Sequence, residues 1–284
     1  MISKIVCIDA GHYGKYNRCP NNSKYYESEV MWKIHLLQKK YLEQLGIKVI
    51  LTRGDQSKDL TLGTRGKLSE GCDLFISNHT NAVGSGMNEK VDYVAVYHLV
   101  NDTTTKCDNV SKEIAQKLAP IIAEVMGTKQ GYKVLSRKSD NDKNKDGMLN
   151  DNYYGVLNGA RSVGIPALII EHSFHTNTRT VKWLLVDSNL DKLARAEAEC
   201  IASYLLGKKV TLNTSTTTTT VSSFKVKVKV DGLNIRKGPG TSYAKVGCIT
   251  DKGVYTIVET NGNWGKLKSG AGWINISDKY VTKK

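Results

Sequence analysis

The sequence predicts two domains of different class, an α/β domain followed by a small all-β barrel. Three observations support this prediction. Continuous apolar strands alternate with amphipathic helices up to about residue 207, a threonine-rich run follows, and from residue 224 apolar residues recur at every second position. Buried strands separated by helices are typical of a mostly parallel, twisted sheet with helices on both faces. We therefore expect domains over 1–207 and 224–284, joined by a linker over 208–223.

The apolar pattern of the first domain predicts its elements in chain order. Strands are expected over residues 2–8, 47–51, 73–77, 91–98 and 166–170. Helices are expected where apolar residues recur at helical spacing, over residues 30–45, 110–125 and 193–205. Gly46 follows the first helix at the position where a glycine commonly ends a helix.

The linker and the second domain are distinguished by composition and period. Residues 211–223 read TLNTSTTTTTVSS and have no apolar periodicity, which is typical of a linker. From Phe224 to Val230 apolar residues alternate with lysines, which predicts a strand with one buried and one cationic face. Turn signals at 231–232, at 238–240 and at the Asn-Gly pair 261–262 predict further short strands.

The net charge of +14 is unevenly distributed, because residues 222–284 contain 12 Lys and Arg against 4 Asp and Glu. This excess favours a polyanionic partner, such as nucleic acid, anionic lipid or a cell wall rich in phosphate and carboxylate. No apolar run approaches the roughly 20 residues that span a bilayer. Residues 1–10 contain only a four-residue apolar stretch, which predicts a strand and no signal peptide. We therefore expect no membrane insertion, and release or non-classical export for any role outside a cytoplasm.

Side chains that can bind a metal or carry a proton follow several of the predicted strands. His12 follows the first strand, Glu27 precedes the first helix, His79 follows the third strand and Glu171 follows the last strand. Open α/β sheets hold their sites beyond the carboxyl ends of the strands, so we expect these four residues to meet. Two histidines and a carboxylate are the protein ligands of a catalytic zinc site, and a further carboxylate can transfer the proton. Glu29 is a rival for the third ligand position.

The same residues carry a resemblance to a known family. The motifs are Asp9-Ala10-Gly11-His12, Glu27, Arg65, His79-Thr80-Asn81-Ala82 and Pro166-Ala167-Leu168-Ile169-Ile170-Glu171. In this order, residues 1–207 resemble the zinc-dependent N-acetylmuramoyl-L-alanine amidases of the amidase-3 type. The resemblance implies one Zn²⁺ bound by His12, Glu27 and His79, with Glu171 as the catalytic carboxylate. It also implies cleavage of the amide between N-acetylmuramic acid and L-alanine in bacterial cell wall peptidoglycan.

Two positions depart from the pattern of that family. Tyr13-Gly14 follows His12 where a second glycine is usual, so the loop can differ in shape. His172 follows Glu171 where a small or apolar residue is commoner, which leaves His172 and His175 as candidate helpers. His172 is the weaker of the two, because adjacent strand residues point to opposite faces of a sheet. Glu27 fits the family spacing better than Glu29.

Residues 224–284 contain a second set of motifs, at 233–236 (LNIR), 238–241 (GPGT), 264–267 (WGKL) and 272–274 (GWI), together with Tyr243. By these motifs the segment resembles bacterial SH3 domains, which bind cell wall. Trp273 is expected in the core, as aromatic residues of so small a barrel usually are. The role of Tyr243 is left open.

Several competing interpretations remain. The loop Asp142–Gly147 matches the start of an EF-hand calcium site, but Tyr153 occupies the twelfth position, so a solvated loop is favoured.

A zinc endopeptidase of stem peptides and a non-catalytic wall-binding protein are the alternative functions. Nucleic acid is disfavoured because no groove-reading helix is predicted. The absence of a predicted signal peptide fits a phage lysis enzyme, an endolysin, with a host autolysin as the alternative.

Overall fold

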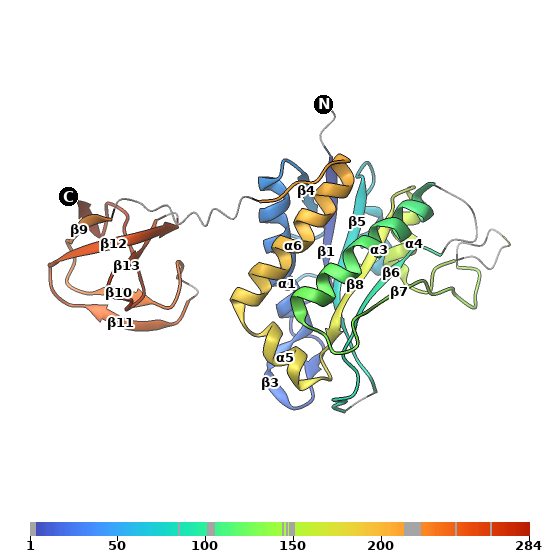
Figure 1. Cartoon of the computed structure of the whole chain (residues 1–284), viewed down its shortest axis with the longest axis horizontal. Coiled ribbons are helices and arrows are strands. Elements are labelled where there is room, and N and C mark those ends of the chain that lie inside the picture. The colour runs from blue at the N-terminus through green and yellow to red at the C-terminus, as the bar shows by residue number, and fades with distance from the viewer. Residues whose placement is uncertain are drawn as a thin grey trace. The chain divides into compact units, whose positions relative to one another are not determined.

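The computed structural model describes residues 4–84, 86–100, 106–143, 145, 147, 151–212, 223–241, 243–261 and 263–284. The chain divides into two compact units, Met1–Leu212 and Asn213–Lys284 (Figure 1). The predicted linker over 208–223 lies for the most part outside the described residues, which end at 212 and resume at 223. Each unit is therefore described by itself.

The first unit contains strands and helices that alternate along the chain. Its strands are β1 (Ile5–Ala10), β2 (Arg18–Cys19), β3 (Asn22–Tyr26), β4 (Lys48–Leu51), β5 (Leu74–Asn81), β6 (Val94–His98), β7 (Tyr132–Leu135) and β8 (Ala167–Phe174). Its helices are α1 (Glu27–Gln44), α2 (Leu62–Lys67), α3 (Lys106–Met126), α4 (Gly155–Ser162), α5 (Thr178–Leu184) and α6 (Asp187–Leu206). The five predicted strands and three predicted helices correspond to β1, β4, β5, β6, β8, α1, α3 and α6. The φ of Gly46 is 81°, as expected of a glycine that ends a helix.

The main sheet has the strand order β4-β1-β5-β8-β6-β7 (Figure 1). Four of its pairings are parallel, whereas β6 pairs with β8 in antiparallel orientation. The sheet is therefore mixed, with β6 and β7 running against the other four strands. A strand that runs parallel to the one before it in the same sheet needs a long crossover, usually a helix, and the described residues between β5 and β6 form none.

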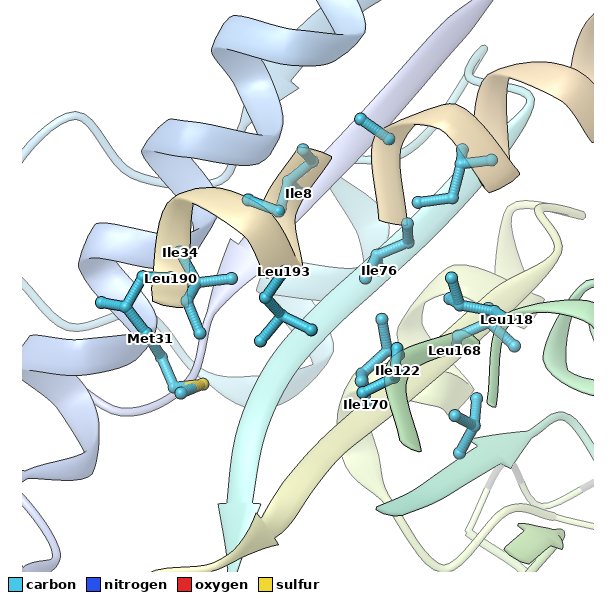
Figure 2. Packing of buried hydrophobic residues seen from close by; sticks show 14 of the residues in the cluster. Ile8, Met31, Ile34, Ile76, Leu118, Ile122, Leu168, Ile170, Leu190 and Leu193 are labelled. Atoms are coloured by element: carbon cyan, nitrogen blue, oxygen red, sulfur yellow. The ribbon is translucent and has the colours of Figure 1, made fainter. Parts of the chain in front are cut away.

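Helices cover both faces of this sheet, as predicted. On one face, α1, α3 and α6 pack over β1, β5 and β8 in a large apolar core (Figure 2). Ile8, Ile76 and Leu168 of the strands are all fully buried there. On the other face a smaller core packs Val156, Leu157 and Ala160 of α4 against the strands. No helix among the described residues combines the length and the apolarity that a bilayer span requires.

The second unit is all-β in its described residues. Its strands are β9 (Phe224–Val228), β10 (Leu233–Arg236), β11 (Lys245–Ile249), β12 (Val254–Asn261), β13 (Trp264–Leu267), β14 (Trp273–Asn275) and β15 (Val281–Lys283). They form one sheet in the order β11-β10-β14-β13-β12-β9-β15, and the pairings are antiparallel. Val226 and Val228 are buried while Lys225 and Lys227 are exposed, which confirms the predicted alternation. Trp273 is buried as predicted, and Tyr243 is exposed.

Candidate metal centre

Three of the four predicted site residues form a compact cluster in the first unit. One ligand atom each from His12, Glu27 and His79 lies within 4.8 Å of the others. The cluster is drawn from three separate elements: the loop after β1, the first turn of α1, and β5. Among the described residues, these three side chains form a group that is arranged to hold a metal ion.

His12 lies in the loop directly after β1 and has a left-handed backbone, with φ of 59°. That conformation costs a non-glycine residue on the order of 1 kcal/mol and persists only where its surroundings hold it. Arg65, which is almost fully buried, donates from Nη2 to the His12 carbonyl at 3.2 Å and from Nη1 to the Ala10 carbonyl at 3.2 Å. The predicted motif residue Arg65 therefore holds the loop that carries His12.

The unusual Tyr13-Gly14 segment is fixed by the start of α1. Ser28 donates from Oγ to the Gly14 carbonyl at 2.8 Å and accepts from the Tyr16 amide at 2.9 Å. The Tyr16 ring stacks on the His12 imidazole with centroids 4.8 Å apart. The loop thus differs in sequence from the family pattern, yet it still presents His12 beside the first turn of the helix.

Glu27 is the first residue of α1 and is fully buried. Its Oε1 lies 2.9 Å from His79 Nδ1 and 3.3 Å from His12 Nε2. Burial alone would raise the pKa of Glu27, but the hydrogen bonds with His12 and His79 outweigh it and hold that pKa well below its usual range. Glu27 is therefore an ionised carboxylate, which is the form that binds a cation. Glu29, the predicted rival, is only half-buried and is not part of the cluster.

His79 lies in β5, and its second ring nitrogen, Nε2, is positioned by neighbouring polar side chains. Its Nε2 lies 3.1 Å from Ser77 Oγ, which donates to Asp9 Oδ2 at 2.8 Å. Asp9 is fully buried and also accepts from Thr52 Oγ1 at 2.6 Å. Such outer partners fix the tautomer and the orientation of a ligating imidazole. This arrangement leaves His79 Nδ1 directed at Glu27.

Asn17 was not predicted and lies in contact with the cluster. Its Nδ2 donates to Glu27 Oε2 at 2.7 Å and lies 3.0 Å from His12 Nε2. Its φ of 52° places it in the left-handed region that asparagine tolerates best among side-chain-bearing residues. No local motif marks it, because the short hairpin of β2 and β3 that brings Asn17 back to Glu27 has no apolar pattern.

Glu171 lies in β8, opposite His79 in the parallel register with β5. Its Oε2 is buried and has no hydrogen-bond partner among the described residues. Burial raises the pKa of Glu171 to about 8, and the negative charge of Glu27 contributes to the rise. A buried carboxylate oxygen without a partner can accept or give up a proton more readily than one that is locked in hydrogen bonds.

His175 also lines the site and lies beside Glu27. Its Nδ1 is 3.7 Å from Glu27 Oε2 and 3.1 Å from Thr80 Oγ1, which is itself 2.9 Å from the Tyr25 hydroxyl. Burial lowers the pKa of His175 below its ordinary value. Of the two candidate helpers, His175 is therefore the one that faces the site.

His172 points to the opposite face of the sheet, as predicted for a residue next to Glu171. Its Nε2 lies 2.8 Å from Glu197 Oε1 on α6, and its Nδ1 lies 3.0 Å from the His79 carbonyl. Gln38 of α1 donates to Glu197 Oε2 at 2.9 Å and exchanges hydrogen bonds with Asn78. These four side chains are all fully buried. They tie together the residues next to His79 and Glu171.

A cavity of about 640 Å³ opens onto the cluster of His12, Glu27 and His79 and onto Glu171. Its lining contains the site residues together with Lys143, Tyr153 and Tyr154. A volume of this size suits a ligand of several hundred daltons. A larger cavity, of about 730 Å³, lies along α3 and α6, but its only carboxylate is Glu199 and its only thiol is Cys200.

The prediction that His79 and Glu171 follow their strands is wrong in detail. The parallel ladder continues through this pair, so β5 runs to Asn81 and β8 to Phe174. Polar residues end the apolar run that marks a strand in sequence, but they do not end the backbone hydrogen bonding. The ladder breaks only beyond His79, where the register shifts and Ser173 adopts φ of 60°.

The predicted calcium-like loop is described only in part. Asp142 accepts hydrogen bonds from the backbone amides of Lys145, at 2.6 Å, and Gly147, at 2.9 Å. Such bonds are typical of a solvated turn built on an aspartate. Asn144 and Asp146 lie outside the described residues.

Known proteins resemble this chain over most or all of its length. Residues 6–203 match the family model described as N-acetylmuramoyl-L-alanine amidase. The endolysin of Bacillus phage SPP1 is similar over the whole chain: it is 26% identical over 295 residues, which covers 100% of this chain and 99% of that protein.

Solved structures resemble the first unit. Cwp6 from Clostridium difficile is 26% identical with a TM-score of 0.60, and the match covers 72% of this chain but only 29% of that longer one. The catalytic domain of CwlV, an N-acetylmuramoyl-L-alanine amidase from Bacillus (Paenibacillus) polymyxa var. colistinus, is 23% identical with a TM-score of 0.56, covering 72% of this chain and 99% of that one. At that identity the second likeness concerns the fold alone.

Proposed function

The chain belongs to the N-acetylmuramoyl-L-alanine amidase family, and on this premise we propose that it hydrolyses the amide between N-acetylmuramic acid and L-alanine in peptidoglycan with the help of one zinc ion. The observation that carries the proposal is the convergence of His12, Glu27 and His79 beside Glu171 in one cavity. The similarity to a phage endolysin over the full chain supports the same substrate.

The donor set fits zinc. Two imidazoles and one carboxylate are the ligands of many catalytic zinc sites, which keep a further position open. Glu27 supplies an ionised carboxylate, and the hydrogen bond that His79 Nε2 donates to Ser77 Oγ orients His79. Asp9, Ser77 and Arg65 supply the supporting contacts that ligands of such sites usually have. A zinc ion bound here supplies a Lewis acid that lowers the pKa of water towards about 7 and polarises a carbonyl oxygen.

Glu171 is proposed as the acid–base group. It lies opposite His79 and has a buried oxygen free of hydrogen bonds within the described residues. In the proposed reaction Glu171 takes the proton of the attacking water and passes it to the alanine nitrogen as that nitrogen departs. Burial of Glu171 raises its pKa in the metal-free site, which favours the protonated form that returns the proton to the leaving nitrogen.

His175 and Asn17 are proposed to serve Glu27. Asn17 donates to Glu27 Oε2, and His175 lies beyond the same oxygen. Together they fix the carboxylate so that its Oε1 faces His12 and His79. Among the described residues, neither side chain forms a hydrogen bond with the buried Glu171 Oε2.

The second unit is proposed to be an SH3-like module that holds the enzyme on the wall. Its antiparallel sheet and its excess of basic residues support this role. A phage lysis enzyme that is made in the host cytoplasm and released to the wall is the proposed setting, and the similarity to the endolysin supports it. A host autolysin that reaches the wall by another route is the alternative.

Mass spectrometry of digested peptidoglycan tests the proposed function. An amidase produces new L-alanine amino termini and leaves the glycan strands intact. New amino termini within the stem peptides would instead assign a zinc endopeptidase. Absence of any new terminus in the presence of zinc would leave only the non-catalytic, wall-binding alternative. The Glu171→Gln variant is the control for a contaminating hydrolase.

A further inference from the structure

A row of lysines lies on the outward face of β9 and just beyond its end. Lys225, Lys227 and Lys229 occupy every second position and are exposed, while the valines between them are buried. Residues on the same face of a strand are about 7 Å apart along the chain. Lys225 and Lys227 therefore lie on one face of β9, and Lys229 follows directly after the strand.

Among the described residues, no acidic residue is paired with Lys225 or Lys227 on the neighbouring strands. On β12, Thr256 lies opposite Lys225 and Val254 lies opposite Lys227. On β15, Thr282 lies opposite Lys227. Among the described residues of this unit, ion pairs form between Lys252 and Asp231 at 2.9 Å and between Lys266 and Glu259 at 3.0 Å. Neither pair includes a lysine of this row.

A fourth lysine adds to the positive charge. The amide of Lys284 donates to the Lys225 carbonyl at 2.9 Å, so these two residues lie beside each other where β15 pairs with β9. Like charges placed side by side on neighbouring strands destabilise a sheet. We call Lys225, Lys227, Lys229 and Lys284 the lysine row.

Protection of a sheet edge does not explain the lysine row. Lysines on an edge strand prevent pairing with other chains, and this accounts for cations next to β15, which ends the sheet. However, β9 lies between β12 and β15 and has no free edge. Lys225 and Lys227 therefore add mutual repulsion without protecting an edge, which indicates that an anionic ligand compensates for it.

We propose that the lysine row is a binding surface for a phosphodiester polymer of the bacterial wall. The proposal rests on the proposed function, because the wall is where the enzyme is expected to act. A polymer with one phosphate in each repeat presents negative charges in a line, and a row of exposed lysines without an ion pair among the described residues is complementary to it. The row is a surface for attachment and is not part of the catalytic cavity.

Nucleic acid also presents a line of phosphates, but this surface suits it less well. Single-stranded nucleic acids are usually held by aromatic side chains on which bases stack. The residues opposite Lys225 and Lys227 are Thr256, Val254 and Thr282, none of which is aromatic. Tyr280, which accepts from the Lys229 amide, packs against the apolar core of the unit. The described residues of this unit also contain no helix that could enter a groove of a duplex.

The test compares two variants of the full chain that lose the same charge. The first is Lys225→Gln with Lys227→Gln, within the row. The matched control is Lys237→Gln with Lys245→Gln, two exposed lysines near the β10–β11 hairpin. In the sheet order β14, β13 and β12 separate that hairpin from β9. Circular dichroism and thermal melting establish that both variants fold.

Adsorption is measured on purified wall sacs, before and after extraction of phosphodiester polymers with cold hydrofluoric acid. We expect the row variant to bind untreated sacs roughly tenfold more weakly than wild type, from the attraction of single lysines to an anionic surface, while the control binds like wild type. On extracted sacs all three proteins should bind alike, and added salt should remove the difference on untreated sacs.

Three results would overturn the proposal. Equal adsorption of the row variant and the control to untreated sacs would remove the lysine row as the binding surface. A deficit of the row variant that persists on extracted sacs would assign the row to another wall component. Tighter retention of wild type on an oligonucleotide than on untreated sacs, at equal phosphate, would assign it to nucleic acid. Wild type that does not adsorb to either kind of sac would contradict the wall-binding function itself.

Discussion

His79 and Glu171 lie opposite each other in register on the parallel strands β5 and β8. A candidate metal ligand and a candidate proton carrier are thereby fixed by the hydrogen-bond ladder of the sheet and not by a loop. Sites built on strands hold their geometry more rigidly than sites on loops. The pair adjoins the cavity that contains His12 and Glu27, and each of the following predictions depends on this arrangement.

Glu171→Gln should leave a folded protein that binds zinc but has lost turnover. The amide cannot accept the proton of water, and loss of a general base typically lowers the rate roughly 10²- to 10⁴-fold. Hydrolysis of soluble muropeptides and the zinc content of the purified variant are the two measurements. Wild-type turnover in this variant would remove Glu171 from the mechanism.

The contribution of Glu171 to the stability of the metal-free protein should fall as the pH rises from about 5 to about 8. Burial raises the pKa of Glu171 from 4.5 to about 8, so in this window the folded protein keeps a proton that the unfolded chain has released. At this group the unfolded state then binds fewer protons. The contribution of Glu171 to the free energy of unfolding therefore decreases with pH, by a few kcal/mol across the window (about 1.4 kcal/mol per unit).

Glu171→Gln is the matched variant for this pH effect, because glutamine does not titrate. Denaturant unfolding in the presence of a chelator, at several pH values, gives the free energy for both proteins. The difference in stability between variant and wild type should grow in favour of the variant from pH 5 to pH 8. A difference that does not change with pH would show that Glu171 titrates normally in the fold.

Gly11→Ala should weaken metal binding through contact alone. A Cβ at this position would lie 2.4 Å from His79 Cε1 and 2.6 Å from the Asn78 carbonyl oxygen, so His79 or the end of β5 must shift. We expect at least a tenfold loss of zinc affinity, the lower end of the range found when a ligand loses its support. Competition with a chelator of known affinity measures it.

Gly14→Ala is the control for that substitution. Gly14 has φ of 54°, and no atom lies within 4 Å of the place that a Cβ would occupy, so alanine adds only backbone strain. Its expected cost is about 1 kcal/mol of stability, with zinc affinity retained. Equal loss of zinc affinity in the two variants would contradict the contact between Gly11 and His79 as the cause.

Glu197→Leu should destabilise the first unit by roughly 3–5 kcal/mol, because it leaves His172 and Gln38 buried without their common partner. Glu197→Gln should cost much less, since a glutamine can donate to His172 Nε2 and accept from Gln38. Urea unfolding of both variants measures the difference. Equal destabilisation would mean that the carboxylate charge, and not the hydrogen bonding, holds this network together.

The sequence predicted the central elements because burial imposes a clear period on them. The continuous apolar runs of β1 and β8 and the helical spacing of α1, α3 and α6 are set by the cores on the two sides of the sheet. The reversal of β6 could not be predicted in the same way. A strand buried on both faces has the same apolar pattern whichever direction it runs.

Three of the four polar site residues were predicted from their places after strands and Glu27 from its place before the first helix, while Asn17 was not predicted. His12, Glu27, His79 and Glu171 are of types that bind metals or carry protons, and each adjoins a strongly patterned element. Asn17 reaches Glu27 only because the short strands β2 and β3 fold back. Its role depends on a tertiary contact between residues without a local signature. The support of His12 by Arg65 is likewise visible only once the loop and α2 are in place.

The most direct test of the account is the metal content of the purified, active protein, compared with that of Glu27→Gln and Glu29→Gln. We predict one zinc per chain in wild type and in Glu29→Gln, and loss of both zinc and activity in Glu27→Gln. Glu29 is the proper control, because it lies in the same turn of α1 but outside the cluster. Full activity in wild-type protein that contains no zinc, or loss of zinc from Glu29→Gln in place of Glu27→Gln, would contradict it.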